Sequence, residues 1–227
     1  MSTKSGPAEL RVKNVYRKRR LGEIASRWDE RAAGWDRGLQ DPHCYLNEDN
    51  AYQRFLREAW RIIETRWEFC SRQGVIDAGC GTGFVLTELI PAFAWGVGVD
   101  ISRKMIRFAR AKRIRRARFV VSDCFSLRRV CPKAGAVVSR GVLLSHYGHN
   151  QGRQLLRSAR LALAPGGFIF FDFLNLEAKL QHLHAPEDKL YFSRQQVQAL
   201  AHEAGFPKVT IRGEEERRIL LLLGELE

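Results

Sequence analysis

The sequence predicts an α/β fold: a seven-stranded, mostly parallel sheet with an antiparallel last strand, helices on both faces and an N-terminal helical cap. Three observations support this. Apolar, strand-like runs alternate with amphipathic helical patterns between residues 74 and 204. A glycine-rich turn joins the first strand to the first helix, and strand patterns over 209–212 and 218–223 form a closing hairpin. Five β/α units followed by a hairpin give this sheet.

Length and composition fit a single α/β domain with added elements. The 227 residues can bury a sizeable core, and 45% hydrophobic with 28% charged residues is ordinary for a globular protein. No run approaches the roughly 20 apolar residues of a membrane helix, and no apolar targeting segment is apparent. The five cysteines form neither C-x-x-C nor a zinc spacing with histidine. We therefore expect reduced thiols, no metal site, no membrane span and a cytoplasmic location.

The formal net charge of +13 is the unusual feature of the composition. It fits either a nucleic-acid partner, through phosphate contacts, or a solvated basic surface. The basic residues occur along the whole chain and are densest at 17–20, so the solvated surface is favoured.

The first 70 residues are expected to form the helical cap, with the core domain over 71–227. The residues Ile24, Trp28, Ala32 and Trp35 recur at helical spacing and predict one apolar face. A turn follows at 41–44, and then a long amphipathic helix over 49–70. Most aromatic residues of that helix are expected to pack in the core. Its apolar stripe consists of Tyr52, Phe55, Leu56, Ala59, Ile62 and Ile63.

The core domain alternates strands and helices. Strands are predicted at 74–77, 94–100, 117–121, 136–140 and 168–173. Helices are predicted at 82–90, 102–112, 151–163 and 193–204, with Ser102 and Ser193 as N-caps and Gly205 after the last one. A turn is expected at 164–167, and irregular chain from 174 to about 192.

The stretch 75–85 organises this domain. The glycines Gly79, Gly81 and Gly83 permit positive φ and let a ligand approach the backbone, while amides opening the next helix suit an anionic group. Phe84 stands where a dinucleotide fingerprint needs its third glycine, and no Gly-Lys-Ser/Thr of a P-loop is present. The structural alternative is a tight strand–helix turn.

The series Asp-x-Gly-x-Gly-x-Gly from Asp77 to Gly83 resembles the first motif of the class I S-adenosyl-L-methionine (SAM)-dependent methyltransferases of small-molecule type. Two further stretches share the resemblance: 28–36 is similar to the family's FD-x-x-A-x-x-YD entry helix, and 163–171 to its L-x-P-G-G strand entry. The resemblance implies SAM as cofactor, with S-adenosyl-L-homocysteine (SAH) as product. It assigns the ribose hydroxyls to Asp100 and the adenine amine to Asp123, for which the alternative is a loop cap.

The cofactor contacts expected from this resemblance lie in the glycine loop and at the strand ends. They are Asp77, Gly79, Cys80, Gly81, Asp100, Ile101, Asp123, Cys124 and Arg140.

Methyl transfer is an in-line displacement that mainly needs alignment and exclusion of water. A base helps when the acceptor atom carries a proton, and His146 and Tyr147 are the candidate catalytic residues because the stretch after the fourth strand should face the methyl group. For each, a structural role is the alternative. His149 is a further candidate, and His182 and His184 are weaker ones.

The predicted function is transfer of a methyl group from SAM to an oxygen or nitrogen of a small-molecule acceptor. The arginine-rich N-terminal segment suits an acidic acceptor. No Asn/Asp-Pro-Pro-Tyr follows the fourth strand, which weakens the alternative of an RNA methyltransferase. A SAM-binding pseudoenzyme acting on a partner protein is the other alternative, and the oligomeric state is left open.

Overall fold

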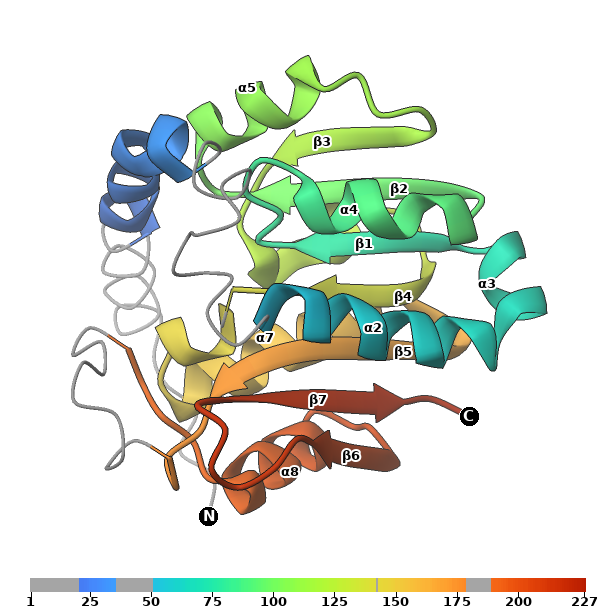
Figure 1. Ribbon diagram of the computed structural model, residues 1–227, viewed down its shortest axis with the longest axis vertical. Helices are drawn as coiled ribbons and strands as arrows, with labels where there is room; N and C mark the ends of the chain where they lie inside the picture. Colours follow the sequence, from blue (N-terminus) through green and yellow to red (C-terminus); the bar gives the residue numbers. More distant parts are fainter. Residues whose placement is uncertain (1–20, 36–50, 142, 179–188) are drawn as a thin grey trace, which may run out of the picture.

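The computed structural model describes residues 21–35, 51–141, 143–178 and 189–227 (Figure 1). The strands are β1 Gly74–Ala78, β2 Trp95–Asp100, β3 Ala117–Val121, β4 Ala134–Ser139, β5 Leu163–Leu174, β6 Lys208–Arg212 and β7 Ile219–Glu225. The helices are α2 Ala51–Glu64, α3 Trp67–Arg72, α4 Phe84–Leu89, α5 Arg103–Ala111, α6 Leu127–Val130, α7 His149–Leu161 and α8 Arg194–Glu203. Short 3-10 helices are η2 Ile90–Ala92, η3 Cys124–Ser126 and η4 Leu143–His146.

The sheet confirms the predicted architecture. Its seven strands lie in the order β3-β2-β1-β4-β5-β7-β6, and only β7 runs antiparallel to its neighbours. The chain changes direction across the sheet between β1 and β4, which both pair with parallel partners on either side. In such sheets ligands bind beyond the carboxyl ends of the strands at this point.

Helices cover both faces of the sheet. Apolar side chains of α2, α4 and α5 pack on one face, and those of α7 and α8 on the other. The central strand β1 is buried at all five positions, as expected for a strand covered on both sides. Both layers therefore leave only the edges and ends of the sheet open.

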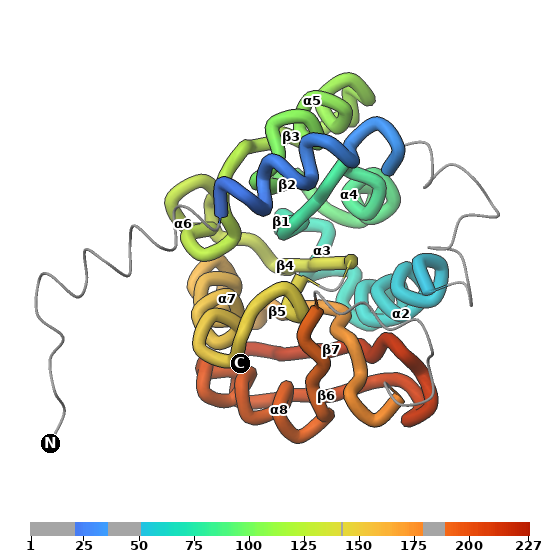
Figure 2. The backbone as a smooth tube through the Cα atoms, turned by 90° about the vertical axis from the view of Figure 1, so that its left-hand side faces the viewer, coloured from blue at the N-terminus to red at the C-terminus, as the bar shows by residue number. Residues whose placement is uncertain are grey.

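A further helix, described over residues 21–35 and called the N-terminal helix below, lies across the carboxyl ends of β1 to β3 (Figure 2). It therefore stands at the end of the sheet where a ligand is expected.

The predicted helix ends at Ser102, Ser193 and Gly205 are confirmed. The Ser102 hydroxyl accepts a hydrogen bond from the Met105 amide, and Ser193 forms a capping box with Gln196. Gly205 has φ of 96°, the left-handed conformation that glycine adopts without steric cost after a helix.

The single long helix predicted over 49–70 is wrong. Within the described part of that range the chain forms α2 and α3, separated at residues 65–66. The Thr65 hydroxyl bonds back to the Ile62 carbonyl oxygen, and Arg66 leaves the helical conformation with φ of −131°. The Arg66 guanidinium pairs with the Glu225 carboxylate of β7, a tertiary contact that the helical pattern does not reveal.

The turn predicted at 164–167 is also wrong in its placement. These residues belong to β5, which begins at Leu163 opposite Ala134 and shifts its register before Ala136. Gly166, with φ of 71°, accommodates the irregularity. The basic residues 17–20 and the turn predicted at 41–44 lie outside the described residues.

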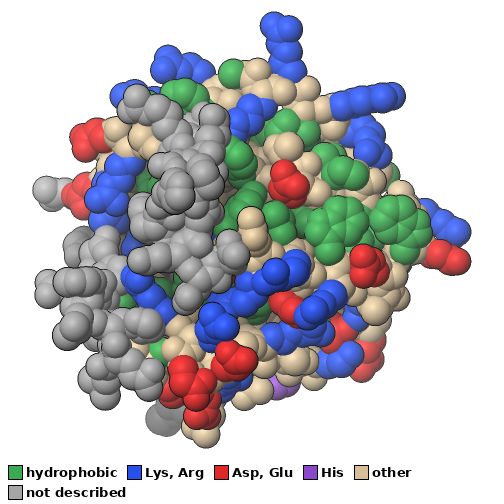
Figure 3. Space-filling model, in the orientation of Figure 1, with side chains coloured by type: hydrophobic (Ala, Val, Ile, Leu, Met, Phe, Trp, Pro, Cys, Tyr) green, Lys and Arg blue, Asp and Glu red, His purple; other side chains and the backbone are tan. Residues whose placement is uncertain are grey.

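Basic side chains occur across the face shown in Figure 3, but their excess over acids is local. Residues 103–133 hold twelve of the 38 Lys and Arg and one of the 25 Asp and Glu, leaving 26 and 24 for the remainder of the chain. The net charge therefore belongs largely to the β3 edge of the sheet. None of the helices in the described ranges has the length and apolarity needed to cross a membrane.

Candidate functional site

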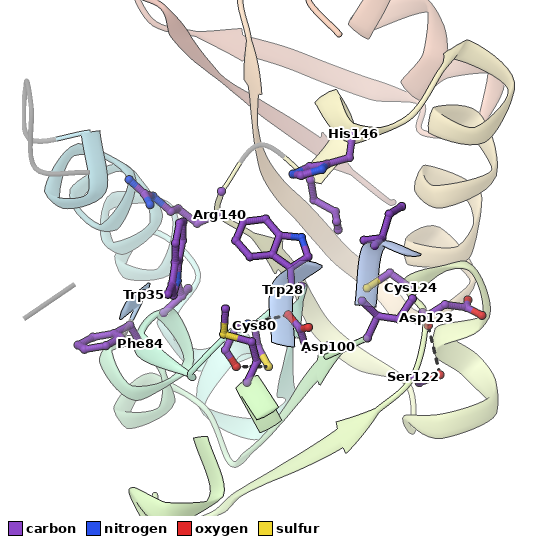
Figure 4. Close-up of a pocket in the computed structure, with 18 of the residues that line it drawn as sticks. Trp28, Trp35, Cys80, Phe84, Asp100, Ser122, Asp123, Cys124, Arg140 and His146 are labelled. Atoms are coloured by element: carbon purple, nitrogen blue, oxygen red, sulfur yellow. Dashed lines mark hydrogen bonds between the residues drawn. The ribbon is translucent and has the colours of Figure 1, made fainter. Parts of the chain in front are cut away.

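A pocket opens at the carboxyl ends of the central strands (Figure 4). Its floor is formed by the glycine loop and by the residues that end β2, β3 and β4. One wall comes from the N-terminal helix through Ile24, Trp28 and Trp35, and another from η4 and the residue after it. Segments far apart in the chain thus meet at the edge where the sequence places the candidate site.

The three glycines of the loop all have positive φ, and two of them have different tasks. A Cβ atom at Gly83 would come within 2.9 Å of the Phe119 ring, so this glycine allows α4 to pack against β3. A Cβ atom at Gly81 would lie 3.5 Å from the Trp35 indole nitrogen and 3.9 Å from Met105 Sδ, both ordinary contact distances. Gly81 therefore keeps the backbone accessible from the pocket.

Asp77 lies beneath the loop and does not belong to the pocket lining. Its side chain is 1% exposed, and within the described residues its Oδ2 atom has no hydrogen-bond partner. Burial, together with the nearby charge of Asp100, raises the pKa of Asp77 to about 8. A carboxyl group held in this way favours its neutral form until a positive group approaches.

Asp100 joins the glycine loop to the start of α5. Its Oδ2 accepts from the Gly81 amide at 2.9 Å, and its Oδ1 accepts from the Ser102 amide at 2.8 Å. Burial raises the pKa of Asp100, and these amide hydrogen bonds oppose the shift. A carboxylate offers about four lone-pair positions, so two bonds leave Asp100 able to accept from further donors in the pocket.

Asp123 follows β3 and lines the pocket beside Cys124. Its Oδ1 accepts from the Phe125 amide at 2.8 Å, so Asp123 caps η3. The alternative interpretation of Asp123 as a loop cap is thus observed, and it coexists with a position in the pocket.

The two cysteines of the pocket, Cys80 and Cys124, are buried. Burial raises the pKa of both thiols well above the usual value. Both thiols therefore stay protonated near neutral pH and line the pocket without acting as nucleophiles.

The fourth strand leads to the opposite side of the pocket. Arg140 lines it, with its guanidinium carbon 5.1 Å from the centre of the Tyr52 ring. Tyr147 also lines it, is 7% exposed, and packs edge-on against Phe125.

His146 reaches the pocket from η4. The Lys189 ammonium nitrogen lies 2.7 Å from both ring nitrogens of His146. An ammonium group can only donate, and a neutral imidazole has one nitrogen that accepts, so at most one of these two contacts is a hydrogen bond. The His146 ring also lies 6.0 Å from the Trp28 ring, centre to centre.

The structure separates one further histidine candidate, His149, from this group. His149 begins α7, where its ring lies 5.3 Å from that of Phe192, and it is not part of the pocket lining. His182 and His184 lie outside the described residues.

Sequence reasoning missed three residues around the pocket. Tyr52, which belongs to the predicted apolar stripe, lines the pocket because it stands in the first turn of α2, nearest the strand ends. Lys189 contacts His146, and Asp29 bonds to the start of α5. The position of Tyr52 at the polar end of an apolar stripe could have indicated its place in the pocket. No local sequence pattern marks Lys189 or Asp29.

Comparison with known proteins agrees with this geometry. Residues 75–167 match a family model described as a methyltransferase domain. Two ubiquinone biosynthesis O-methyltransferases are each 28% identical to this chain. The enzyme from Idiomarina loihiensis aligns over 52% of this chain and 49% of its own length. The enzyme from Thiobacillus denitrificans aligns over 70% of this chain and 63% of its own length. The chain thus spans about half to just under two thirds of the length of these relatives.

Solved structures share the fold at low sequence identity. Magnesium protoporphyrin IX methyltransferase from Synechocystis, crystallised with SAH, superposes with a TM-score of 0.71 at 16% identity, covering 91% of this chain and 99% of that chain. DesVI from Streptomyces venezuelae superposes with a TM-score of 0.65 at 19% identity, covering 81% of this chain and 95% of that chain. Residues 75–167 of this chain are therefore similar to a methyltransferase domain, and the chain shares its fold with SAM-dependent methyltransferases of known structure.

Proposed function

We propose that this protein is a SAM-dependent methyltransferase that methylates a small-molecule acceptor, with an oxygen atom as the favoured acceptor. The observation that carries the proposal is the meeting of the glycine loop, Asp100 and Asp123 in one pocket with His146 and Tyr147 on its far side. Cofactor and acceptor residues thus face one cavity. The O-methyltransferase relatives support oxygen over nitrogen.

The residues present fit SAM. The cofactor carries a positive sulfonium and an ammonium group, and the buried Asp77 Oδ2 lacks a hydrogen-bond partner within the described residues. Asp100 has capacity for two hydroxyl donors, and Asp123 for an exocyclic amine. Gly79, Cys80, Ile101, Cys124 and Arg140 complete the proposed cofactor contacts.

When bound, SAM supplies a methyl group on a sulfonium, which makes it a good electrophile. The chain's own contribution is to align the acceptor and keep water away. The indole rings of Trp28 and Trp35 and the phenol of Tyr147 form apolar walls for this purpose. Asp100 holds the glycine loop in place at the cofactor end of the pocket, because its carboxylate accepts a hydrogen bond from the Gly81 amide.

His146 is the proposed general base. A neutral imidazole has one nitrogen that accepts a proton, so in this step Lys189 moves off that nitrogen and the imidazole takes the proton of the acceptor hydroxyl as the methyl group is transferred. Tyr147 is the second candidate, placed beside it in the pocket lining. Lys189 also brings a positive charge to this side, which suits an acceptor with an acidic group.

The relatives do not favour the alternatives of an RNA methyltransferase or a pseudoenzyme. A cytoplasmic location and an acidic acceptor stay predictions.

The direct test is to incubate the purified protein with SAM carrying a labelled methyl group and a panel of hydroxylated aromatic acids, matched phenols and matched aryl amines. We expect SAH formation with label on oxygen, and faster turnover for the acids than for the phenols. Label on nitrogen alone would replace the oxygen assignment, and SAH binding without turnover of any acceptor would favour a pseudoenzyme.

A further inference from the structure

The N-terminal helix is joined to the cofactor side of the pocket by one acidic side chain. Asp29 Oδ1 accepts hydrogen bonds from the Ser102 hydroxyl and, at 2.9 Å, from the Lys104 amide. These partners lie 73 and 75 residues further along the chain. The contact is therefore tertiary, and it forms only when the N-terminal helix lies against the start of α5.

The first turn of α5 needs such a contact. It contains no acidic residue of its own and begins with two cations, Arg103 and Lys104. Cations at a helix N-terminus oppose the helix dipole, and the first amides of a helix lack partners within it. Ser102 caps the Met105 amide, and Asp29 supplies both the acceptor for the Lys104 amide and the missing negative charge.

The hydrogen bonds of Asp29 hold its carboxylate in the charged form. Although partial burial acts in the opposite direction, the bonds from Ser102 and Lys104 lower the pKa of Asp29. The contact is thus charge-assisted, the stronger class of hydrogen bond.

The same network reaches the proposed cofactor acid. The Ser102 hydroxyl contacts Asp29, and the Ser102 amide donates to Asp100 Oδ1 at 2.8 Å. Asp100 in turn holds the Gly81 amide of the glycine loop. A continuous set of bonds therefore connects the N-terminal helix with the floor of the pocket.

The residue next to Asp29, Trp28, lines the pocket. Trp28 packs against Trp35 with ring centres 5.2 Å apart and lies 6.0 Å from the His146 ring (Figure 4). Fixing Asp29 consequently also fixes the indole that stands between the cofactor side and the candidate base.

We propose that Asp29 is a positioning residue that fastens the N-terminal helix to α5 and thereby couples closure of this pocket wall to the ribose acid Asp100. This inference rests on the proposed function, because only there is Asp100 a cofactor contact. Coupling is reciprocal, so a ligand on Asp100 strengthens the docking of the N-terminal helix, and docking strengthens binding of the ligand.

The experiment compares Asp29→Ala and Asp29→Asn with Glu30→Gln, a matched control because Glu30 is the exposed acid next in the same helix. Amide hydrogen exchange of residues 21–35 is measured with and without SAH. In the free protein we expect exchange about tenfold faster in Asp29→Ala, an intermediate value in Asp29→Asn, and no change in Glu30→Gln. SAH should slow this exchange in the wild type and far less in Asp29→Ala.

Binding and kinetics complete the test. We expect the Kd for SAH and the KM for SAM to rise about tenfold in Asp29→Ala while kcat changes less, with Asp29→Asn in between. Exchange and Kd equal to those of Glu30→Gln would overturn the inference. Failure of the wild type to bind SAH would instead overturn the proposed function, and the exchange of the free protein would still decide whether Asp29 fastens the helix. If Asp29→Ala does not fold, the same measurements are compared between Asp29→Asn and Glu30→Gln.

Discussion

The two sides of the pocket are built in different ways. The cofactor side comes from consecutive β/α units, and each of its residues stands at or just after the carboxyl end of a strand, as Asp100 and Asp123 do. The acceptor side is assembled from the N-terminal helix, the segment after β4 and the chain around Lys189. The first side is fixed by sheet geometry and the second by tertiary contacts between distant segments. Variants on the acceptor side should therefore change kcat, and variants on the cofactor side should change SAH affinity.

The largest effect is expected on the acceptor side from His146→Ala. Losing a positioned base should lower kcat by about 100-fold to 10,000-fold, while SAH affinity stays near that of the wild type. Steady-state kinetics with an identified acceptor, together with SAH titration, measure both quantities.

His149→Ala is the matched control, because that ring packs against Phe192 outside the pocket lining. Equal losses in both variants, or a large loss of SAH affinity in His146→Ala, would show that the two sides are not separate.

On the cofactor side, Asp100→Asn should weaken SAH binding by about 100-fold. The amide cannot accept from both the Gly81 and Ser102 amides and two hydroxyls as a carboxylate does, and hydrogen bonds to a charged acceptor are each worth about 1.5–3 kcal/mol. Calorimetric titration measures the loss. Unchanged affinity would remove Asp100 from the site.

The positions of the strand-end residues and the glycine loop could be predicted from the sequence, because strand ends and glycine-rich turns are local features; that these residues bind a cofactor stays a prediction. Asp100, Asp123 and Gly81 could all be placed from the alternation of strands and helices. The acceptor side could be predicted only in part. His146 and Tyr147 follow from their position after β4, but Lys189 and Asp29 act through partners more than 40 residues away. The break between α2 and α3 was missed for the same reason, since the Arg66 guanidinium pairs with β7.

Asp77 provides a pH test of the cofactor side. Its pKa is raised to about 8 in the folded, ligand-free protein, so at pH 7 it holds a proton that it must release before its charge can attract a cationic ligand in the pocket above it. SAM affinity should therefore rise about tenfold per pH unit below pH 8 and level off above it. Calorimetry across pH measures this, and Asp77→Asn should flatten the profile.

The stability of the free protein should move in the opposite direction with pH. The folded state keeps the Asp77 proton above 3.8, where the unfolded chain loses it, so the contribution of Asp77 to stability falls as pH rises from about 4 to about 8. Denaturant unfolding of the wild type and Asp77→Asn across this range checks the sign. Measured relative to Asp77→Asn, the stability of the wild type should fall as pH rises through this range; a relative stability that rises would contradict the raised pKa.

The smallest effect is expected from Tyr52→Phe. In the described part of the protein the Tyr52 hydroxyl is buried without a hydrogen-bond partner, so removing it should leave the Tm unchanged or slightly higher. If the hydroxyl binds the cofactor, SAH affinity should fall about tenfold or less. A lowered Tm with unchanged affinity would assign Tyr52 to the core, as its sequence pattern suggested.

The most direct measurement is a side-by-side calorimetric titration of the wild type, Asp100→Asn and His146→Ala with SAH. The predicted result is similar affinity in the wild type and His146→Ala, and about 100-fold weaker binding by Asp100→Asn. No binding by the wild type, or the same affinity in all three proteins, would contradict a cofactor site at the ends of these strands.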